Sequence, residues 1–214
     1  MIFESERKAV CEWAKAMWKA GLVVGSAGNV SSRTSDPKNF VITPSSVPYG
    51  DLTPDQIVVI DGDGELVDGE RAPSFETPMH LAVYKARPDA GAVFHTHSRY
   101  ATVLSVLHKP IPPVVDEMVV YLGGPVEVAE YGASGSDELA ENALKGLGDK
   151  AAVLLANHGP LCVGKDLAKA FKICELVEHL SQIVCIACML GEPKELPADV
   201  IAYEKEMYSV VRTM

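Results

Sequence analysis

A tight-turn signal in the first third of the chain restricts the possible folds more than any other feature. Residues 56–60 and 64–67 form two short runs of strand length, and Asp61-Gly62-Asp63 lies between them. This pattern is typical of a β-hairpin. Because a hairpin joins antiparallel neighbours, it disfavours a doubly wound parallel sheet.

The rest of the chain alternates strand-length apolar runs with segments of helical periodicity. We expect helices over residues 4–20, from Thr77 as N-cap to before Arg87-Pro88, and from Ser98 as cap to residue 107. Further helices should start at Ser136, run from Asp166 to about residue 190, and start near residue 198. Short strands are expected at residues 40–43 and 126–129. With 214 residues and 48% hydrophobic side chains, the chain predicts a single domain over residues 1–214.

Charge and composition exclude several classes of protein. The formal net charge is -10, from 19 basic and 29 acidic residues, and no Lys/Arg cluster is present, so we expect no nucleic-acid partner. The N-terminus lacks the basic-then-apolar order of a signal peptide, and no eighteen apolar residues run together. We therefore expect a cytoplasmic protein without a membrane segment. The odd number of cysteines argues against a disulfide scaffold.

Two apolar runs end in histidine. Residues 91–98 carry His95 and His97, which share one face of a strand about 7 Å apart and could bind one metal ion. The alternative is that both are polar residues at the open end of a strand. Residues 151–156 form a second buried-looking strand, which delivers His158 at its end. A zinc site needs such a third donor.

Hydroxyl-rich turns and isolated carboxylates supply further candidates. The stretch around Gly28 and Asn29 could cradle an oxyanion, although a plain Gly/Ser turn explains it equally well. Glu76 lies just outside a helix N-terminus, where it is either a simple helix-end charge or an acid/base group. Asp116-Glu117, between apolar residues at an expected strand end, could be edge charges or pocket carboxylates.

The order of the short motifs carries more information than any one of them. G-S-A-G-N-V-S, I-T-P, P-S-x-E, H-x-H, G-G and N-H-G follow one another over nearly the whole chain. Together they resemble the class II, zinc-dependent sugar-phosphate aldolase family, which also includes ribulose-5-phosphate 4-epimerases and adducin-like domains. The resemblance implies a three-layer α/β/α domain around a mostly antiparallel sheet, assembled as a homotetramer with active sites at subunit interfaces.

The resemblance also implies roles for individual residues. His95, His97 and His158 match the zinc ligands, although iron, cobalt or manganese could use the same donors. Glu76 matches the acid/base carboxylate, with Glu117 or a C-terminal tyrosine such as Tyr208 handling the proton on the aldehyde-side hydroxyl. The positions that match the family's phosphate-binding set are Gly28, Asn29, Ser45, Ser46 and Ser74.

Two positions depart from the aldolase pattern. Phe75 stands where the family's aldolases often have a second serine before the glutamate. Glu117 stands where fuculose-phosphate aldolase has a tyrosine, and it resembles the base of related methylthioribulose-phosphate dehydratases.

The predicted reaction is reversible cleavage of a ketose 1-phosphate to dihydroxyacetone phosphate and an aldehyde. Breaking that C–C bond leaves an enediolate, whose charge a divalent cation can stabilise as a Lewis acid. A dehydratase, epimerase or decarboxylase of the same fold is the nearest alternative, and Glu76 argues against the first two. A non-catalytic, adducin-like assembly domain is disfavoured because the three histidines are kept.

Overall fold

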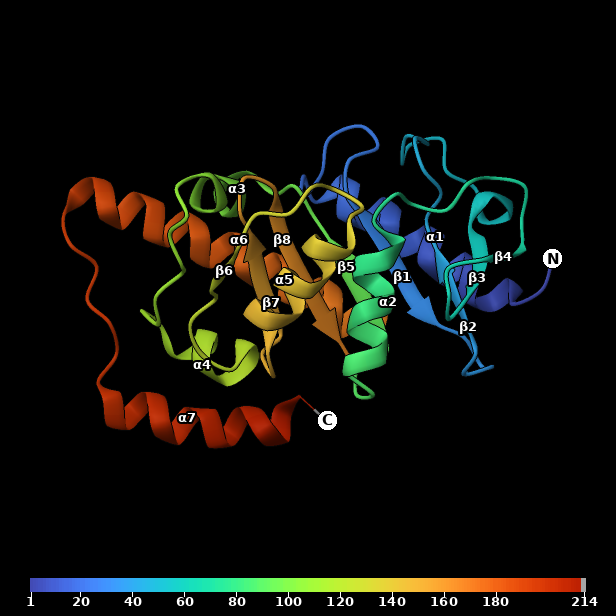
Figure 1. Ribbon diagram of the computed structural model, residues 1–214. Coiled ribbons are helices and arrows are strands. Elements are labelled where there is room, and N and C mark those ends of the chain that lie inside the picture. Colours follow the sequence, from blue (N-terminus) through green and yellow to red (C-terminus); the bar gives the residue numbers. More distant parts are fainter. Residues whose placement is uncertain (213–214) are drawn as a thin grey trace.

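A single eight-stranded sheet organises the protein, in the order β4-β3-β2-β1-β5-β8-β7-β6 (Figure 1). This is a computed structural model in which residues 1–212 are described. The strands are β1 (Asn29–Arg33), β2 (Asn39–Ile42), β3 (Val58–Asp61), β4 (Leu66–Asp68), β5 (Ala92–His95), β6 (Val128–Ala129), β7 (Ala152–Leu155) and β8 (Gly159–Gly164). Every neighbouring pair is antiparallel except β6 and β7. The prediction of a mostly antiparallel sheet is confirmed.

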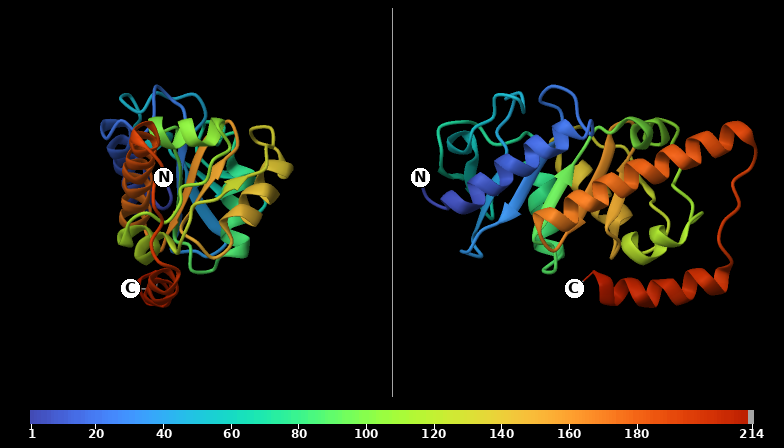
Figure 2. Two further views of the ribbon diagram at one scale, coloured as in Figure 1. Left: turned by 90° about the vertical axis from the view of Figure 1, so that its left-hand side faces the viewer. Right: turned by 180° about the vertical axis from the view of Figure 1, so that it is seen from behind.

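Helices cover both faces of this sheet (Figure 2). They are α1 (Glu4–Lys19), α2 (Thr77–Ala86), α3 (Arg99–Val106), α4 (Asp116–Leu122), α5 (Asp137–Leu147), α6 (Leu167–Leu190) and α7 (Ala198–Val211), with a 3₁₀ turn η1 (Pro54–Gln56). One face packs against α1 and α6, and the other against α2 and α5. Because side chains alternate along a strand, Phe94 joins the core under α1 and α6 while Val93 joins the core under α2 and α5. The three-layer architecture follows from this alternation.

Helix ends agree with the sequence in some places and differ in others. Ser136 and Asp166 cap α5 and α6, as predicted, by accepting from backbone N–H groups. The N-cap of α2 is Glu76 rather than the expected Thr77, whose hydroxyl donates to the carbonyl of Ser74. Ser98 has the N-cap position of α3, but its side chain makes no capping bond.

Residues 114–121 differ most from the structure that the sequence predicts. The expected strand end is helix α4, with Asp116 and Glu117 in its first turn. Charged residues there suit the positive end of the helix dipole, which explains why an apolar run interrupted by acids becomes a helix. The strand that follows is β6, shorter than the expected 126–129.

Helix α6 is, by length and composition alone, a candidate membrane span among the described residues. Its buried residues extend from Leu167 to Val184 and pack on β8 and α3. The last turn differs, because Met189 and Leu190 are 84% and 85% exposed. The helix is therefore a core element up to about Val184 and a projecting one beyond it.

Candidate metal centre and its carboxylate

The sheet register brings the predicted histidines to one edge. Asn29 at the start of β1 pairs with His95 at the end of β5. Strands β5 and β7 both run antiparallel to β8, so their carboxyl ends lie at the same edge. His158 lies in the turn that leaves β7 there, and His97 follows two residues after His95. We call this boundary of the sheet the histidine edge.

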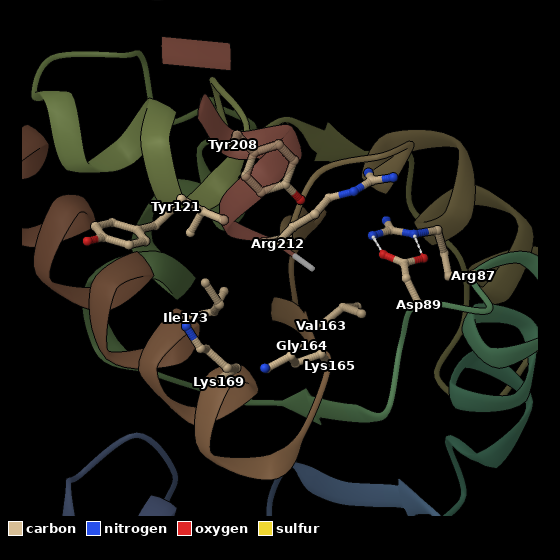
Figure 3. A pocket seen from close by; sticks show the side chains of 12 residues that line it. Arg87, Asp89, Tyr121, Val163, Gly164, Lys165, Lys169, Ile173, Tyr208 and Arg212 are labelled. Atoms are coloured by element: carbon tan, nitrogen blue, oxygen red, sulfur yellow. Dashed lines mark hydrogen bonds and ion pairs between the residues drawn. The ribbon is translucent and has the colours of Figure 1, made fainter. Parts of the chain in front are cut away.

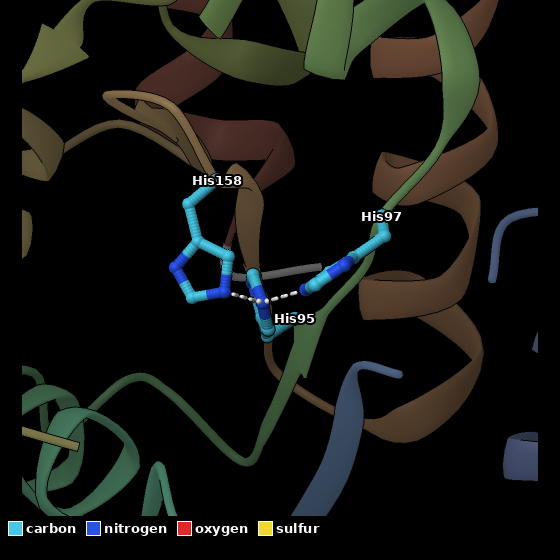
Figure 4. A group of neighbouring side chains, drawn as sticks. All are labelled: His95, His97 and His158. Atoms are coloured by element: carbon cyan, nitrogen blue, oxygen red, sulfur yellow. Dashed lines mark hydrogen bonds between the residues drawn. The ribbon is translucent and has the colours of Figure 1, made fainter. Parts of the chain in front are cut away.

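The three imidazole rings converge on a common point (Figure 4). His95 Nε2 lies 2.9 Å from His97 Nε2 and 3.3 Å from His158 Nε2. His95 Nδ1 is 3.1 Å from the carbonyl oxygen of Pro160. Because a carbonyl only accepts, Nδ1 carries the proton and Nε2 presents a lone pair to the other rings.

This donor set fits a divalent transition metal. One ligand atom from each histidine lies within 4.8 Å of the other two. Tetrahedral zinc with Zn–N bonds of about 2.0–2.1 Å would separate its nitrogen ligands by roughly 3.4 Å, close to the spacing found. A hydrogen bond from Nδ1 to a backbone carbonyl is also how metal-binding imidazoles are usually oriented. His95, His97 and His158 would hold such an ion.

Two glycines allow the segments that carry the histidines to approach closely. A Cβ atom at Gly159 would lie 2.3 Å from the carbonyl oxygen of Thr96, between His95 and His97. A Cβ atom at Gly28 would lie 2.6 Å from the carbonyl oxygen of His95. Gly28 also has a φ of +77°, which favours glycine. Both glycines are therefore required by packing at the histidine edge.

The Glu76 carboxylate lies beside the histidines and is held on both sides. Its Oε2 is 3.3 Å from His95 Nε2, and its Oε1 is 3.4 Å from His158 Nε2. Asn29 Nδ2 donates to Oε2 over 2.9 Å, and the Ser134 hydroxyl donates to Oε1 over 2.9 Å. The sequence did not single out Ser134, although a hydroxyl in the Gly132–Gly135 loop after a strand was a usable signal.

Glu76 is held in its ionised form. Burial would raise the pKa of Glu76, but His95, His158 and the hydrogen bonds from Asn29 and Ser134 outweigh it and lower the pKa to about 2. Burial lowers the pKa of His95 to about 3, so this imidazole is neutral at neutral pH. At neutral pH the Glu76 carboxylate is therefore stabilised by the hydrogen bonds from Asn29 and Ser134. Burial does not raise the pKa of Glu76 toward neutrality, so the ionised carboxylate is suited to take up a proton.

The predicted phosphate-binding residues also gather at the histidine edge. Ser45 follows β2 and Ser74 precedes α2, and a bridge between Pro44 and Pro73 places the two turns side by side. Ser45 Oγ donates to the carbonyl of Pro73, and Ser74 Oγ accepts from the Glu76 N–H. Ser46 is exposed in a left-handed conformation with a φ of 59°, and Phe75 is 80% exposed. Phosphate binding by this set, with Gly28 and Asn29, stays a prediction.

Tyr208 does not lie at the histidine edge. Its ring packs on Gly123, and its hydroxyl donates to the carbonyl of Asp149, which precedes β7 at the opposite edge. It lines a pocket with Arg87, Asp89 and Arg212 (Figure 3). Within one chain Tyr208 therefore lies away from the histidines, because α7 packs on α4, and its role at a site shared between subunits stays a prediction.

Within one chain, Glu117 also lies away from the three histidines. It is exposed in the first turn of α4, whose last residue, Leu122, accepts from the Ala151 N–H at the opposite edge. Among the described residues, no contact joins Glu117 to Glu76 or the histidines.

A three-layer domain with three histidines and a carboxylate at one sheet edge defines the class II aldolase fold, and comparisons agree. The family described as class II aldolase and adducin N-terminal domain matches residues 8–185. The 5-deoxy-D-ribulose 1-phosphate aldolase of Bacillus thuringiensis is 37% identical over 199 residues, covering 93% of each chain. An Escherichia coli L-fuculose phosphate aldolase is 36% identical over 183 residues, 86% of this chain and 84% of that one.

Solved structures give the same result. An L-fuculose 1-phosphate aldolase superposes with a TM-score of 0.91 at 38% identity, covering 96% of each chain. The chain belongs to the class II aldolase family. The predictions of the family, the fold class and an aldolase are confirmed.

Proposed function

We propose that this protein cleaves a ketose 1-phosphate reversibly to dihydroxyacetone phosphate and an aldehyde. The observation that supports this most directly is the convergence of three imidazole Nε2 atoms, two of which lie 3.3 Å and 3.4 Å from the ionised Glu76, beside the hydroxyl-rich turns. Named relatives act on 5-deoxy-D-ribulose 1-phosphate and on L-fuculose phosphate. A phosphorylated ketose therefore fits both the site and the relatives.

The residues divide the chemistry among them. His95, His97 and His158 would hold a divalent cation, which we propose to be zinc, and the ion would supply Lewis-acid polarisation of the substrate carbonyl. Asn29, Ser45, Ser46 and Ser74, with the backbone at Gly28, bind the phosphate and fix the orientation of the ketose. Glu76 removes the proton from the carbon next to the carbonyl during synthesis and returns it during cleavage.

A second proton must leave the aldehyde-side hydroxyl during cleavage. Glu117 is exposed, which suits a residue that completes the site of a neighbouring subunit. We propose a homotetramer with interfacial active sites, in which Glu117 takes this role. Glu76→Gln and Glu117→Gln tetramers, each with low activity, should regain activity when dissociated and reassembled together. A mixture no more active than its two components would contradict the shared site.

The reaction itself is tested with metal-analysed protein. Purified protein should contain about one zinc per chain and release dihydroxyacetone phosphate from at least one of a panel of ketose 1-phosphates, including 5-deoxyribulose and fuculose 1-phosphates. Glu76→Gln protein with the same metal content is the matched control. Absence of release from every substrate, with metal bound, would contradict the proposal and favour a dehydratase or decarboxylase.

A further inference from the structure

A chain of buried side chains continues from Glu76 into the core. Asn29 Nδ2 donates to Glu76 Oε2 over 2.9 Å, and Asn29 Oδ1 is 2.5 Å from His80 Nε2. His80 Nδ1 is 2.6 Å from Ser31 Oγ, which is 2.8 Å from the Tyr84 hydroxyl. Asn29, Ser31, His80 and Tyr84 are at most 3% exposed. A buried polar chain of this kind is satisfied only if every donor meets an acceptor.

The hydrogen bond that Glu76 Oε2 accepts from Asn29, while Oε1 accepts from Ser134, sets the direction of every bond in this chain. A carboxylate only accepts, so the Asn29 amide must turn its NH₂ group toward Glu76 and its oxygen toward His80. That oxygen also only accepts, so His80 must carry its proton on Nε2. His80 is fully buried without a carboxylate in hydrogen-bond contact, so it is neutral and its Nδ1 accepts from Ser31.

The last bond follows from the others. Because the Ser31 proton points to His80, Ser31 Oγ accepts from the Tyr84 hydroxyl. Tyr84, Ser31, His80 and Asn29 therefore donate in series, and the series ends at the Glu76 carboxylate. The opposite tautomer of His80 would place two acceptors 2.5 Å apart, or turn the Asn29 oxygen against the carboxylate.

We propose that His80 is a positioning residue of the active site. As the Nε2–H tautomer it fixes the Asn29 amide, so that an N–H group always faces Glu76 on the side away from Ser134. His80 acts through Asn29 and touches neither the substrate nor the metal-binding nitrogens. The effect on turnover rests on the proposed aldolase function, whereas the tautomer of His80 is independent of it.

The tautomer is measured first, in metal-free protein at pH 7.5. Long-range ¹H–¹⁵N spectra of the wild type, assigned against a His80→Gln spectrum, should show His80 with a protonated Nε2 and an unprotonated Nδ1. A Ser31→Ala variant removes the donor to Nδ1 but leaves Asn29 and Glu76 in place, so the Nε2–H tautomer should persist. A protonated Nδ1 or an imidazolium in the wild type would overturn the proposal.

Two variants at position 80 then separate positioning from packing. His80→Gln keeps an N–H donor for Asn29 and should retain kcat within about threefold, whereas His80→Leu has none and should lose about 10–100-fold, typical for groups that orient active-site residues. The loss should fall on kcat, with KM and metal content per chain unchanged. Equal kcat in folded His80→Leu and His80→Gln proteins would overturn the positioning role.

The remaining outcomes are also decisive. If circular dichroism shows that His80→Leu is unfolded, kcat of His80→Met, which also lacks an N–H donor for Asn29, is measured in its place, with an expected loss of about tenfold. Unchanged kcat there would contradict the proposal. If the wild type releases no dihydroxyacetone phosphate, the aldolase function fails, and the ¹⁵N spectra still decide whether His80 directs Asn29.

Discussion

The two edges of the sheet differ in how their polar groups are paired. At the edge opposite the histidines, Arg87 donates to the carbonyls of Gly148 and Lys150 and pairs with Asp89, and Tyr208 donates to Asp149. Each donor there meets an acceptor from the protein itself. At the histidine edge, three imidazole Nε2 atoms and a carboxylate lie close together.

This difference separates stability from function. Donors that are fully paired within the chain hold loops to the sheet, and their loss should cost folding free energy. Acceptors gathered on one point need a cation or a proton from elsewhere. We therefore expect substitutions at the histidine edge to remove activity and spare the metal-free fold, and substitutions at the opposite edge to do the reverse.

The largest effect is expected for His158→Ala. Loss of one of three ligands should remove stoichiometric metal and reduce activity to background. The free energy of unfolding of the metal-free protein should change by no more than about 0.5 kcal/mol, since this partly exposed ring makes no bond that holds the fold. Metal analysis and denaturant unfolding measure the two quantities. A metal-free protein destabilised by several kcal/mol would break the comparison.

Glu76→Gln should retain metal and lower kcat by about 10²–10⁴-fold, the usual contribution of general acid–base catalysis. The measurement is dihydroxyacetone phosphate release at matched metal content. Full activity in this variant would remove Glu76 from the mechanism.

Acid should destabilise the metal-free protein through the buried His80. Burial, the main cause, lowers its folded-state pKa to about 4 against the raising effect of Glu76. A depressed folded-state pKa leaves stability intact above the unfolded value of about 6.5, and stability falls as the pH drops from there toward 4. At pH 5, His80 should lower the free energy of unfolding by on the order of 2 kcal/mol relative to neutral pH.

His80→Gln is the control for this pH dependence. Between pH 7.5 and 5, unfolding free energies of the metal-free variant should fall less than those of the wild type by that amount. Glu76 does not affect this pH range. Because its folded-state pKa is about 2, its protonation lowers the free energy of unfolding only as the pH falls below about 4.5. Parallel curves for the two proteins would contradict the burial of a neutral His80.

Arg87→Met tests the opposite edge. Loss of the bonds to two carbonyls and Asp89 should lower the free energy of unfolding by about 2 kcal/mol, while kcat per bound metal stays within about twofold. Chemical denaturation and steady-state kinetics test this pair of outcomes. A large kcat loss with unchanged stability would reverse the comparison.

Ser134→Ala should have the smallest effect. It removes one hydrogen bond to Glu76 while Asn29 keeps the other, so a loss of about 1 kcal/mol, or roughly fivefold in kcat, is expected. Ser134→Thr, which keeps the hydroxyl, is the matched control. Equal kcat in all three proteins would show that Asn29 alone is sufficient to hold Glu76.

The sequence was most informative where local patterns end at a defined place. The apolar runs before His95 and His158 are long enough to mark strand ends, so both histidines could be assigned to an edge. Glu76 could be placed because a proline in the first turn marks the start of α2.

Long-range contacts explain what the sequence did not reveal. The N-terminus of α3 is capped by Glu178, 78 residues after Tyr100, in place of the local Ser98. Tyr208 lies away from the histidine edge because its ring packs on Gly123, where a Cβ atom would lie 2.7 Å from the ring. Such contacts depend on how α6 and α7 fold back on the sheet, which no local periodicity encodes.

X-ray absorption at the zinc edge of zinc-loaded protein tests the central claim most directly. We expect three imidazole nitrogens at about 2.0–2.1 Å, no sulfur ligand, and loss of one imidazole contribution in any zinc that His158→Ala retains. A sulfur ligand, or a His158→Ala spectrum identical to that of the wild type, would contradict a zinc site built from His95, His97 and His158.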